Sequence, residues 1–375
     1  MPTSNTTLWY TRCSVPTPFG IAEQRGWFDE ELAADKDVEI LALQSSPDPK
    51  VHQSHYTHTQ PNSFRQGGNY PAIWARANGS DTRVIGLSWI EAPQAVLVGP
   101  ESNLRSVADL KGKRLLIVRR PHEPIDFPYA TTLRTYEKVL ATAGLTLKDV
   151  ELVERTVDRS FINDHHGASL SRNENVVANR RSGGFAQDSL VALLSGKVDA
   201  IASGGVQVLQ FEKLVGTRVL FDAGNLPDKF ARANNSYPFT FAVNADLIER
   251  RPDLVARLYA RVLEAVDWAK IHPADAIRHL AREQAVSEEL VELTYGDGLA
   301  AGLETDLAAD KIEALRLQKD FLLRHGLITK DFDVEKWIDH RPLQAALKIL
   351  EERRRKPGYP DSVANRSNAL PAFSV

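Results

Sequence analysis

The chain has 375 residues, and its 46 Lys and Arg are nearly balanced by 49 Asp and Glu. This length predicts two domains rather than one, and the balanced charge argues against a nucleic-acid-binding face, so a small ligand is the expected partner. No apolar run is long enough for a membrane helix, and the N-terminus lacks the pattern of an export signal. The single cysteine cannot form an internal disulfide. We therefore expect a cytoplasmic monomer, or a periplasmic protein if an export signal was removed.

Helical and strand patterns alternate along much of the chain. Apolar residues at helical spacing over 18–34 precede a strand at 38–43, and strand patterns follow at 82–90 and 94–99. Further patterns follow in chain order: a turn or short helix and strand over 107–119, a helix over 129–145 that Gly144 ends, a helix and strand over 188–205, a strand within 237–248, and a helix over 252–273. This alternation predicts an α/β fold with ligand loops at strand ends. The polar stretch 159–184 is expected to be a lid or a disordered loop.

The only cysteine, Cys13, follows an apolar strand pattern in the stretch LWYTRCSVP. A lone cysteine is more often a small buried hydrophobe than a nucleophile. Two features favour reactivity: Arg12 could stabilise the thiolate if its side chain turned inward, and reactive groups tend to lie in loops at strand ends. The stretch by itself leaves both interpretations open.

A second candidate site lies within residues 54–77. Gly67 and Gly68 would let the backbone approach a ligand, and free N–H groups at the start of a helix near 69–74 would form an anion site. Arg65 adds a planar, charged fork that suits an anion with two oxygens. The alternative is a glycine turn with a surface arginine.

Two other patterns carry little weight. His52, His55 and His58 are spaced by three residues, but no second group of ligand-type residues accompanies them, so no metal site is expected. The two Ser-Gly-Gly stretches at 182–184 and 203–205 do not match a nucleotide-binding fingerprint. They are turns or the walls of a ligand site.

Several segments, taken in order, resemble the type II solute-binding fold of sulfonate, taurine and nitrate importers. These are LWYTRCSVPTPFGIAEQRGWF, HYTHTQPNSFRQGGNYPAI, SVADLKGKRLLIV and VALLSGKVDAI. Within that fold the chain resembles the 2'-hydroxybiphenyl-2-sulfinate desulfinase family, which has a Tyr-x-x-Cys-x-Val-Pro segment and a His-aromatic-Thr run followed by Arg-x-Gly-Gly. The matching residues are Tyr10, Cys13, Val15, Pro16, His55, Tyr56, Thr57, Arg65, Gly67 and Gly68.

The chain also departs from this family. Thr11, Arg12 and Ser14 differ from the family's residues around the cysteine, and His58 stands where the family has a tyrosine. The aromatic residues that line the family's biaryl pocket have no clear counterpart, because the stretch ASGGVQVLQF is small and polar. The sequence therefore does not indicate which aryl group the ligand carries.

The resemblance implies a type II periplasmic-binding-protein-like α/β fold with two lobes, an inter-lobe ligand cleft and extra C-terminal helices. Residues 1–98 and 236–375 would form the first lobe and residues 99–235 the second. Cys13, His55 and Arg65 would be catalytic. Further substrate contacts would come from Thr11, Gln60, His58, Gly67 and Gly68 in the first lobe and from Tyr129, Gly183 and Ser203 in the second.

The activity implied is the cleavage of an aryl sulfinate by water into the arene and sulfite, without a cofactor. Arg65 and the Gly68 N–H would hold the sulfinate oxygens. Cys13 would protonate the ring carbon or attack sulfur, and His55, supported by Gln60, would orient the thiol or activate water.

Two alternatives use the same fold. The chain could be the solute-binding protein of an importer for sulfonate, taurine or nitrate-like anions, with Cys13 incidental. It could also be a relative of the thiamine-pyrimidine synthases, but that family is expected to carry a cysteine-rich iron motif, and the chain has one cysteine.

Overall fold

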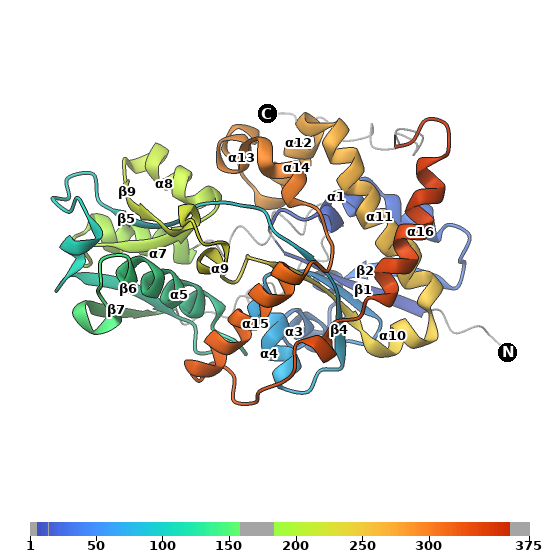
Figure 1. Cartoon of the computed structure of the whole chain (residues 1–375), viewed down its shortest axis with the longest axis horizontal. Coiled ribbons are helices and arrows are strands. Elements are labelled where there is room, and N and C mark those ends of the chain that lie inside the picture. Colours follow the sequence, from blue (N-terminus) through green and yellow to red (C-terminus); the bar gives the residue numbers. More distant parts are fainter. Residues whose placement is uncertain (1–5, 14, 158–183, 361–375) are drawn as a thin grey trace.

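The structure is a computed structural model that describes residues 6–13, 15–157 and 184–360, without the side chains of Arg12 and residues 184–187. Figure 1 shows two lobes side by side, with the elements from β5 to β9 at the left and the sheet of β1, β2 and β4 at the right. The expected lid at 159–184 lies almost wholly outside the described residues. The lobe boundaries at 98/99 and 235/236 stay predictions.

The first lobe is built on a five-stranded sheet with the spatial order β2-β1-β3-β10-β4. β1 is parallel to β2 and β3, whereas β10 is antiparallel to β3 and β4. The carboxyl ends of β1, β2 and β3 therefore meet at one edge, where open α/β sheets bind ligands. The strands are β1 (Thr6–Arg12), β2 (Val38–Ala42), β3 (Ser63–Gly67), β4 (Thr82–Ser88) and β10 (Phe239–Asn244).

Helices pack around this sheet and extend toward the second lobe. α11 starts with Pro252 at its first turn and ends at Ile271, as the sequence pattern predicted, and it packs against α1, α2 and α16. The helices are α1 (Pro18–Gln24), α2 (Trp27–Leu32), α3 (Pro49–Thr57), α4 (Asn69–Ala77), α10 (Ala245–Arg250), α11 (Pro252–Ile271), α12 (Pro273–Gln284), α13 (Glu288–Tyr295), α14 (Leu299–Gly302), α15 (Ala309–Arg324) and α16 (Arg341–Arg354).

The second lobe contains two smaller sheets within the described residues. β5 pairs in antiparallel fashion with β8 and β9, and β6 pairs in parallel with β7. A bridge between Leu115 and Ala200 joins the two sheets, and α5 packs against β5, β6 and β8. The elements are β5 (Gln94–Val98), β6 (Arg114–Arg119), α5 (Phe127–Ala141), β7 (Glu151–Thr156), α7 (Gly184–Leu194), β8 (Ile201–Gly204), α8 (Val206–Val215), β9 (Arg218–Asp222) and α9 (Lys229–Arg232).

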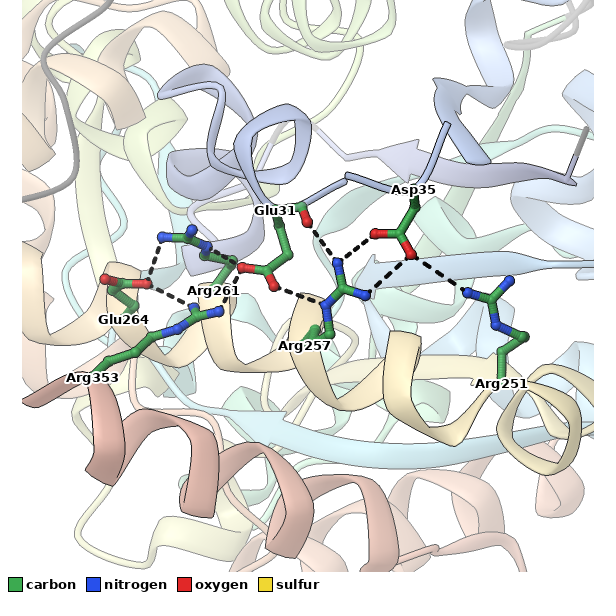
Figure 2. A network of polar contacts seen from close by, with 7 residues as sticks. All are labelled: Glu31, Asp35, Arg251, Arg257, Arg261, Glu264 and Arg353. Atoms are coloured by element: carbon green, nitrogen blue, oxygen red, sulfur yellow. Dashed lines mark hydrogen bonds and ion pairs between the residues drawn. The ribbon is translucent and has the colours of Figure 1, made fainter. Parts of the chain in front are cut away.

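A network of ion pairs ties α2 to α11 and α16 on the first lobe (Figure 2). The Glu264 carboxylate is 1% exposed and accepts from Arg261 and Arg353, each at 3.0 Å. Each charged group faces at least one group of opposite sign, which offsets the free-energy cost of removing it from water. The members are Glu31, Asp35, Arg251, Arg257, Arg261, Glu264 and Arg353.

One expectation about the elements needs correction, and one strand was not predicted. The helix expected over 18–34 is two helices, because the chain turns at Gly26 with a φ of 73°, a conformation that glycine adopts without strain. Residues 63–67, for which no strand was predicted, form the central strand β3. The position of β3 matters for function because it carries Arg65.

Candidate active site

Cys13 and Arg65 lie together because β1 and β3 are parallel neighbours that end at the same edge. The register pairs Thr11 with Arg65, so the next residues along the two strands bring Cys13 beside Gly67. A Cβ atom on Gly67 would overlap the Cys13 sulfur. Gly67 thus allows the backbone to approach closely, as expected, but the group it accommodates is Cys13.

Arg65 is buried in this position with only 5% of its surface exposed. Its Nε donates to the His55 carbonyl oxygen at 3.3 Å and its Nη1 to the Gly68 carbonyl oxygen at 2.8 Å. Within the described residues it forms no ion pair with a carboxylate, and its Nη2 donates to no protein atom. A buried guanidinium without a counter-charge is costly, and a bound anion would supply that charge.

His55 reaches the same site from α3. Its Nδ1 lies 2.5 Å from Thr11 Oγ1, and Thr11 also accepts a hydrogen bond from Gln44. Burial, aided by the Arg65 charge, lowers the pKa of His55 to about 3. The imidazole is therefore neutral near pH 7 and keeps a nitrogen lone pair that can accept a hydrogen bond.

Cys13 is half-buried and keeps its proton near neutral pH. Burial raises the pKa of the thiol above 9.0, and the Glu283 charge raises it further, although Arg65 and the Gly68 backbone N–H oppose them. The Val15 N–H donates to the Cys13 carbonyl oxygen at 2.7 Å. The site thus combines a protonated thiol with a neutral imidazole and a permanent cation.

The start of α4 differs from the anion site that the sequence suggested. The Asn69 N–H donates to the Asn235 carbonyl oxygen at 2.7 Å, and the Tyr70 N–H donates to Asn235 Oδ1 at 2.9 Å. A Cβ on Gly68 would lie within 3 Å of the same amide group. The expectation of free N–H groups was therefore wrong for these two residues, because a side chain from a distant segment caps the helix.

His58 and Gln60 are the other two residues of the first lobe that were expected to contact the substrate through their side chains. His58 ends α3 with a φ of 51°, is buried, and has no partner for Nε2 among the described residues. Burial and the charges of Arg65 and His55 hold its pKa well below 6.5. Gln60 donates from its backbone N–H to Ser54 Oγ at 2.8 Å, and the contact given for the His55 ring is the one from Nδ1 to Thr11. The support of His55 by Gln60 stays a prediction.

The described residues expected from the second lobe have contacts within that lobe. Tyr129 donates from its N–H to Asp126, and its ring lies 4.0 Å from the Arg119 guanidinium. Ser203 lies on β8 opposite Ala95, with a buried Oγ that has no partner among the described residues. Gly183 lies outside the described residues, as do Ser14 and the Arg12 side chain. No described contact links Tyr129 or Ser203 to Cys13 or Arg65.

The three histidines spaced by three do not converge. His52 Nε2 lies 2.5 Å from the Ser46 carbonyl oxygen, whereas His55 turns toward Thr11. Among the residues that the structure describes, no three His, Cys, Asp or Glu side chains are placed to hold a metal ion.

Sequence reasoning missed several residues that shape the site. Asn235 is one of them. At Tyr56 the aromatic ring was matched to the family pattern, but no role was expected for its hydroxyl. Arg120 and Glu123, from the loop after β6 in the second lobe, are both buried and act electrostatically on Tyr56. No motif marked these positions, because their partners are far away in the sequence.

No helix within the described ranges is both long enough and apolar enough to cross a membrane.

The chain is similar to curated enzymes over most of its length. The 2'-hydroxybiphenyl-2-sulfinate desulfinases of Rhodococcus erythropolis and Rhodococcus qingshengii are 27% identical to it over 352 residues, which cover 88% of this chain and 91% of each relative. A family model described as NMT1/THI5 like matches residues 15–184.

Solved structures show the same architecture. The desulfurization enzyme DSZB, solved as a mutant in complex with biphenyl-2-sulfinic acid, aligns with a TM-score of 0.76 and 23% identity over 92% of this chain and 99% of that chain. The aliphatic sulphonate binding protein SsuA from Escherichia coli aligns with a TM-score of 0.62 and 16% identity over 90% and 92% of the two chains. The chain is therefore similar to the 2'-hydroxybiphenyl-2-sulfinate desulfinases over most of its length, as its motifs indicated, and it shares the two-lobed α/β fold of DSZB and of the sulphonate-binding protein SsuA.

Proposed function

We propose that the protein is an aromatic sulfinate desulfinase. The observation that carries the proposal is Arg65, a buried cation without a carboxylate partner among the described residues, beside the chain's single cysteine. An aryl sulfinate offers two anionic oxygens to the free side of this guanidinium. The same anion would place its carbon–sulfur bond near Cys13. The curated relatives act on a sulfinate of this class.

The reaction is a hydrolysis that balances without an electron acceptor. The aryl carbon–sulfur bond breaks, the ring carbon gains a proton, and the oxygen of water joins sulfur, so that an aryl sulfinate and water give the arene and hydrogen sulfite. Arg65 holds the sulfinate oxygens and stabilises charge as the bond breaks.

The state of Cys13 favours one of the two roles that the sequence left open. The raised pKa of its thiol supports proton donation to the ring carbon over attack by a thiolate. After this donation, the attacking water donates a hydrogen bond to the neutral His55, which orients it toward sulfur. The Cys13 thiolate takes up the proton of this water, so that the thiol is restored. Thr11 holds the imidazole in position through Nδ1.

The proposal also covers the surroundings of the reaction. It includes a monomeric enzyme in the cytoplasm, with residues 99–235 as the second lobe and with Tyr129 and Ser203 facing the ring of the substrate. The alternative is a solute-binding protein for sulfonate-like anions, which the fold shared with the sulphonate-binding protein SsuA favours. Both functions use Arg65, and only the enzyme requires Cys13.

Sulfite release separates these functions. The purified protein is incubated with a series of aryl sulfinates, and sulfite and arene are measured together. A desulfinase releases them in equal amounts from at least one member of the series. Tight binding of aryl sulfinates or sulfonates without any sulfite would support the binding protein and contradict the enzyme.

A further inference from the structure

Tyr56 is a buried phenol whose hydroxyl makes no hydrogen bond with any described residue. The residue has no exposed surface. Tyr136, which is equally buried, donates to the Leu116 carbonyl oxygen at 2.7 Å. A buried hydroxyl without a partner destabilises a fold, and a phenylalanine at position 56 would avoid that cost. The hydroxyl therefore has no structural benefit in the unliganded protein.

Tyr56 lies among the side chains that form the anion site. Its ring meets that of His55 edge to face with 4.9 Å between centroids, and the carbonyl of His55 holds Arg65 Nε. Its ring also packs near Phe127 at the start of α5, with 6.2 Å between centroids. Tyr56 thus lies between Arg65 in the first lobe and an element of the second.

The charges around the hydroxyl fix its protonation. Burial raises the pKa of Tyr56 well above 10, and Glu123 and Cys13 raise it further, while Arg120 and Arg65 oppose them. The phenol is therefore neutral and retains a proton that it can donate. An anion on Arg65 is an acceptor within the same group of charges.

We propose that the Tyr56 hydroxyl donates a hydrogen bond to the anionic group of the ligand that Arg65 holds. The proposal rests on the proposed function only in requiring an oxyanion as ligand, and it is independent of turnover. The aromatic position of the family pattern is satisfied by the ring alone. The hydroxyl is thus an additional binding group of this chain.

The test compares Tyr56→Phe with Tyr136→Phe, which removes a hydroxyl that has a protein partner and lies away from the site. The probe is benzenesulfinate, whose ring carries no other acceptor, and its dissociation constant is measured by titration calorimetry. Tyr56→Phe should weaken binding about tenfold or more, the effect of one hydrogen bond to a charged group, with an unchanged or higher Tm. Tyr136→Phe should lower Tm and leave the affinity unchanged.

The outcomes separate this inference from the proposed function. An affinity of Tyr56→Phe within twofold of the wild type would overturn the inference, whether or not Tm falls. A tenfold loss of affinity in a protein that releases no sulfite would contradict the desulfinase and support the role of Tyr56. A wild-type protein that binds no member of the aryl sulfinate series, benzenesulfinate included, would overturn both.

Discussion

Arginines with little exposed surface occur in two regions of the first lobe, and they differ in their partners. In the network of Figure 2, Arg261 and Arg353 both contact Glu31 and Glu264. On β3, Arg65 has only backbone carbonyl oxygens as acceptors among the described residues. Under the proposed function, the network is complete within the chain, whereas Arg65 takes its counter-charge from the bound anion.

Arg65→Met is expected to give the largest difference between the loss of ligand affinity and the loss of stability. The variant should bind benzenesulfinate about 10³-fold more weakly, because two charge-assisted hydrogen bonds and the cation are lost. Its free energy of unfolding should stay within about 1 kcal/mol of the wild type. The loss of the hydrogen bonds of Arg65 destabilises the fold, but the removal of a buried charge without a counter-charge offsets this loss. Calorimetry and urea unfolding measure the two quantities. A strongly destabilised variant with full affinity would show that Arg65 is structural.

Glu264→Gln in the ion-pair network is expected to lower stability and to leave ligand affinity unchanged. Loss of this carboxylate leaves Arg261 and Arg353 short of a counter-charge, so the free energy of unfolding should fall by about 3 kcal/mol. Affinity for benzenesulfinate should not change. Glu249→Gln, which alters an exposed partner of Arg341, is the control and should have a much smaller effect on urea unfolding. If the two variants lowered the free energy of unfolding equally, the buried ion pair would contribute no more to stability than the exposed one, which would contradict the prediction.

Acid should weaken the two regions in different pH ranges. The pKa values of His55 and His58 lie below 6.5, mainly because of burial. As pH falls from 6.5 toward 3, the unfolded chain binds protons that the folded chain does not, and stability falls by up to ~1.4 kcal/mol per pH unit for each histidine.

The network responds at lower pH. Burial acts to raise the pKa of Glu31, but the hydrogen bonds and charges of Arg257, Arg353 and Arg261 lower it below 4.5. Its stabilising contribution is therefore complete above pH 4.5 and is lost as pH falls through the lower, folded-state value. Urea unfolding from pH 7.5 down to about pH 3 covers both ranges. His55→Asn should reduce the slope between pH 5 and 6.5, and an unchanged slope would contradict the neutral state of His55.

The sequence predicted the parts of the fold and site that depend on local pattern. Alternating strand and helix patterns indicated the α/β fold, and two short motifs indicated Cys13, His55 and Arg65, which the structure brings to one sheet edge. The cap of α4 was not predictable, because Asn235 lies 165 residues beyond Tyr70. The ion-pair network was missed for the same reason, since Glu31 and Arg353 meet only through the packing of α2 and α16.

The most direct test of the account compares sulfite release by the wild type and Cys13→Ser with the same aryl sulfinate. Serine is nearly the same size as cysteine but far less acidic, so it cannot replace the thiol as a proton donor. The account predicts that Cys13→Ser keeps the affinity for the sulfinate and loses turnover by a factor of about 10²–10⁴. Sulfite release by Cys13→Ser at the wild-type rate would contradict it.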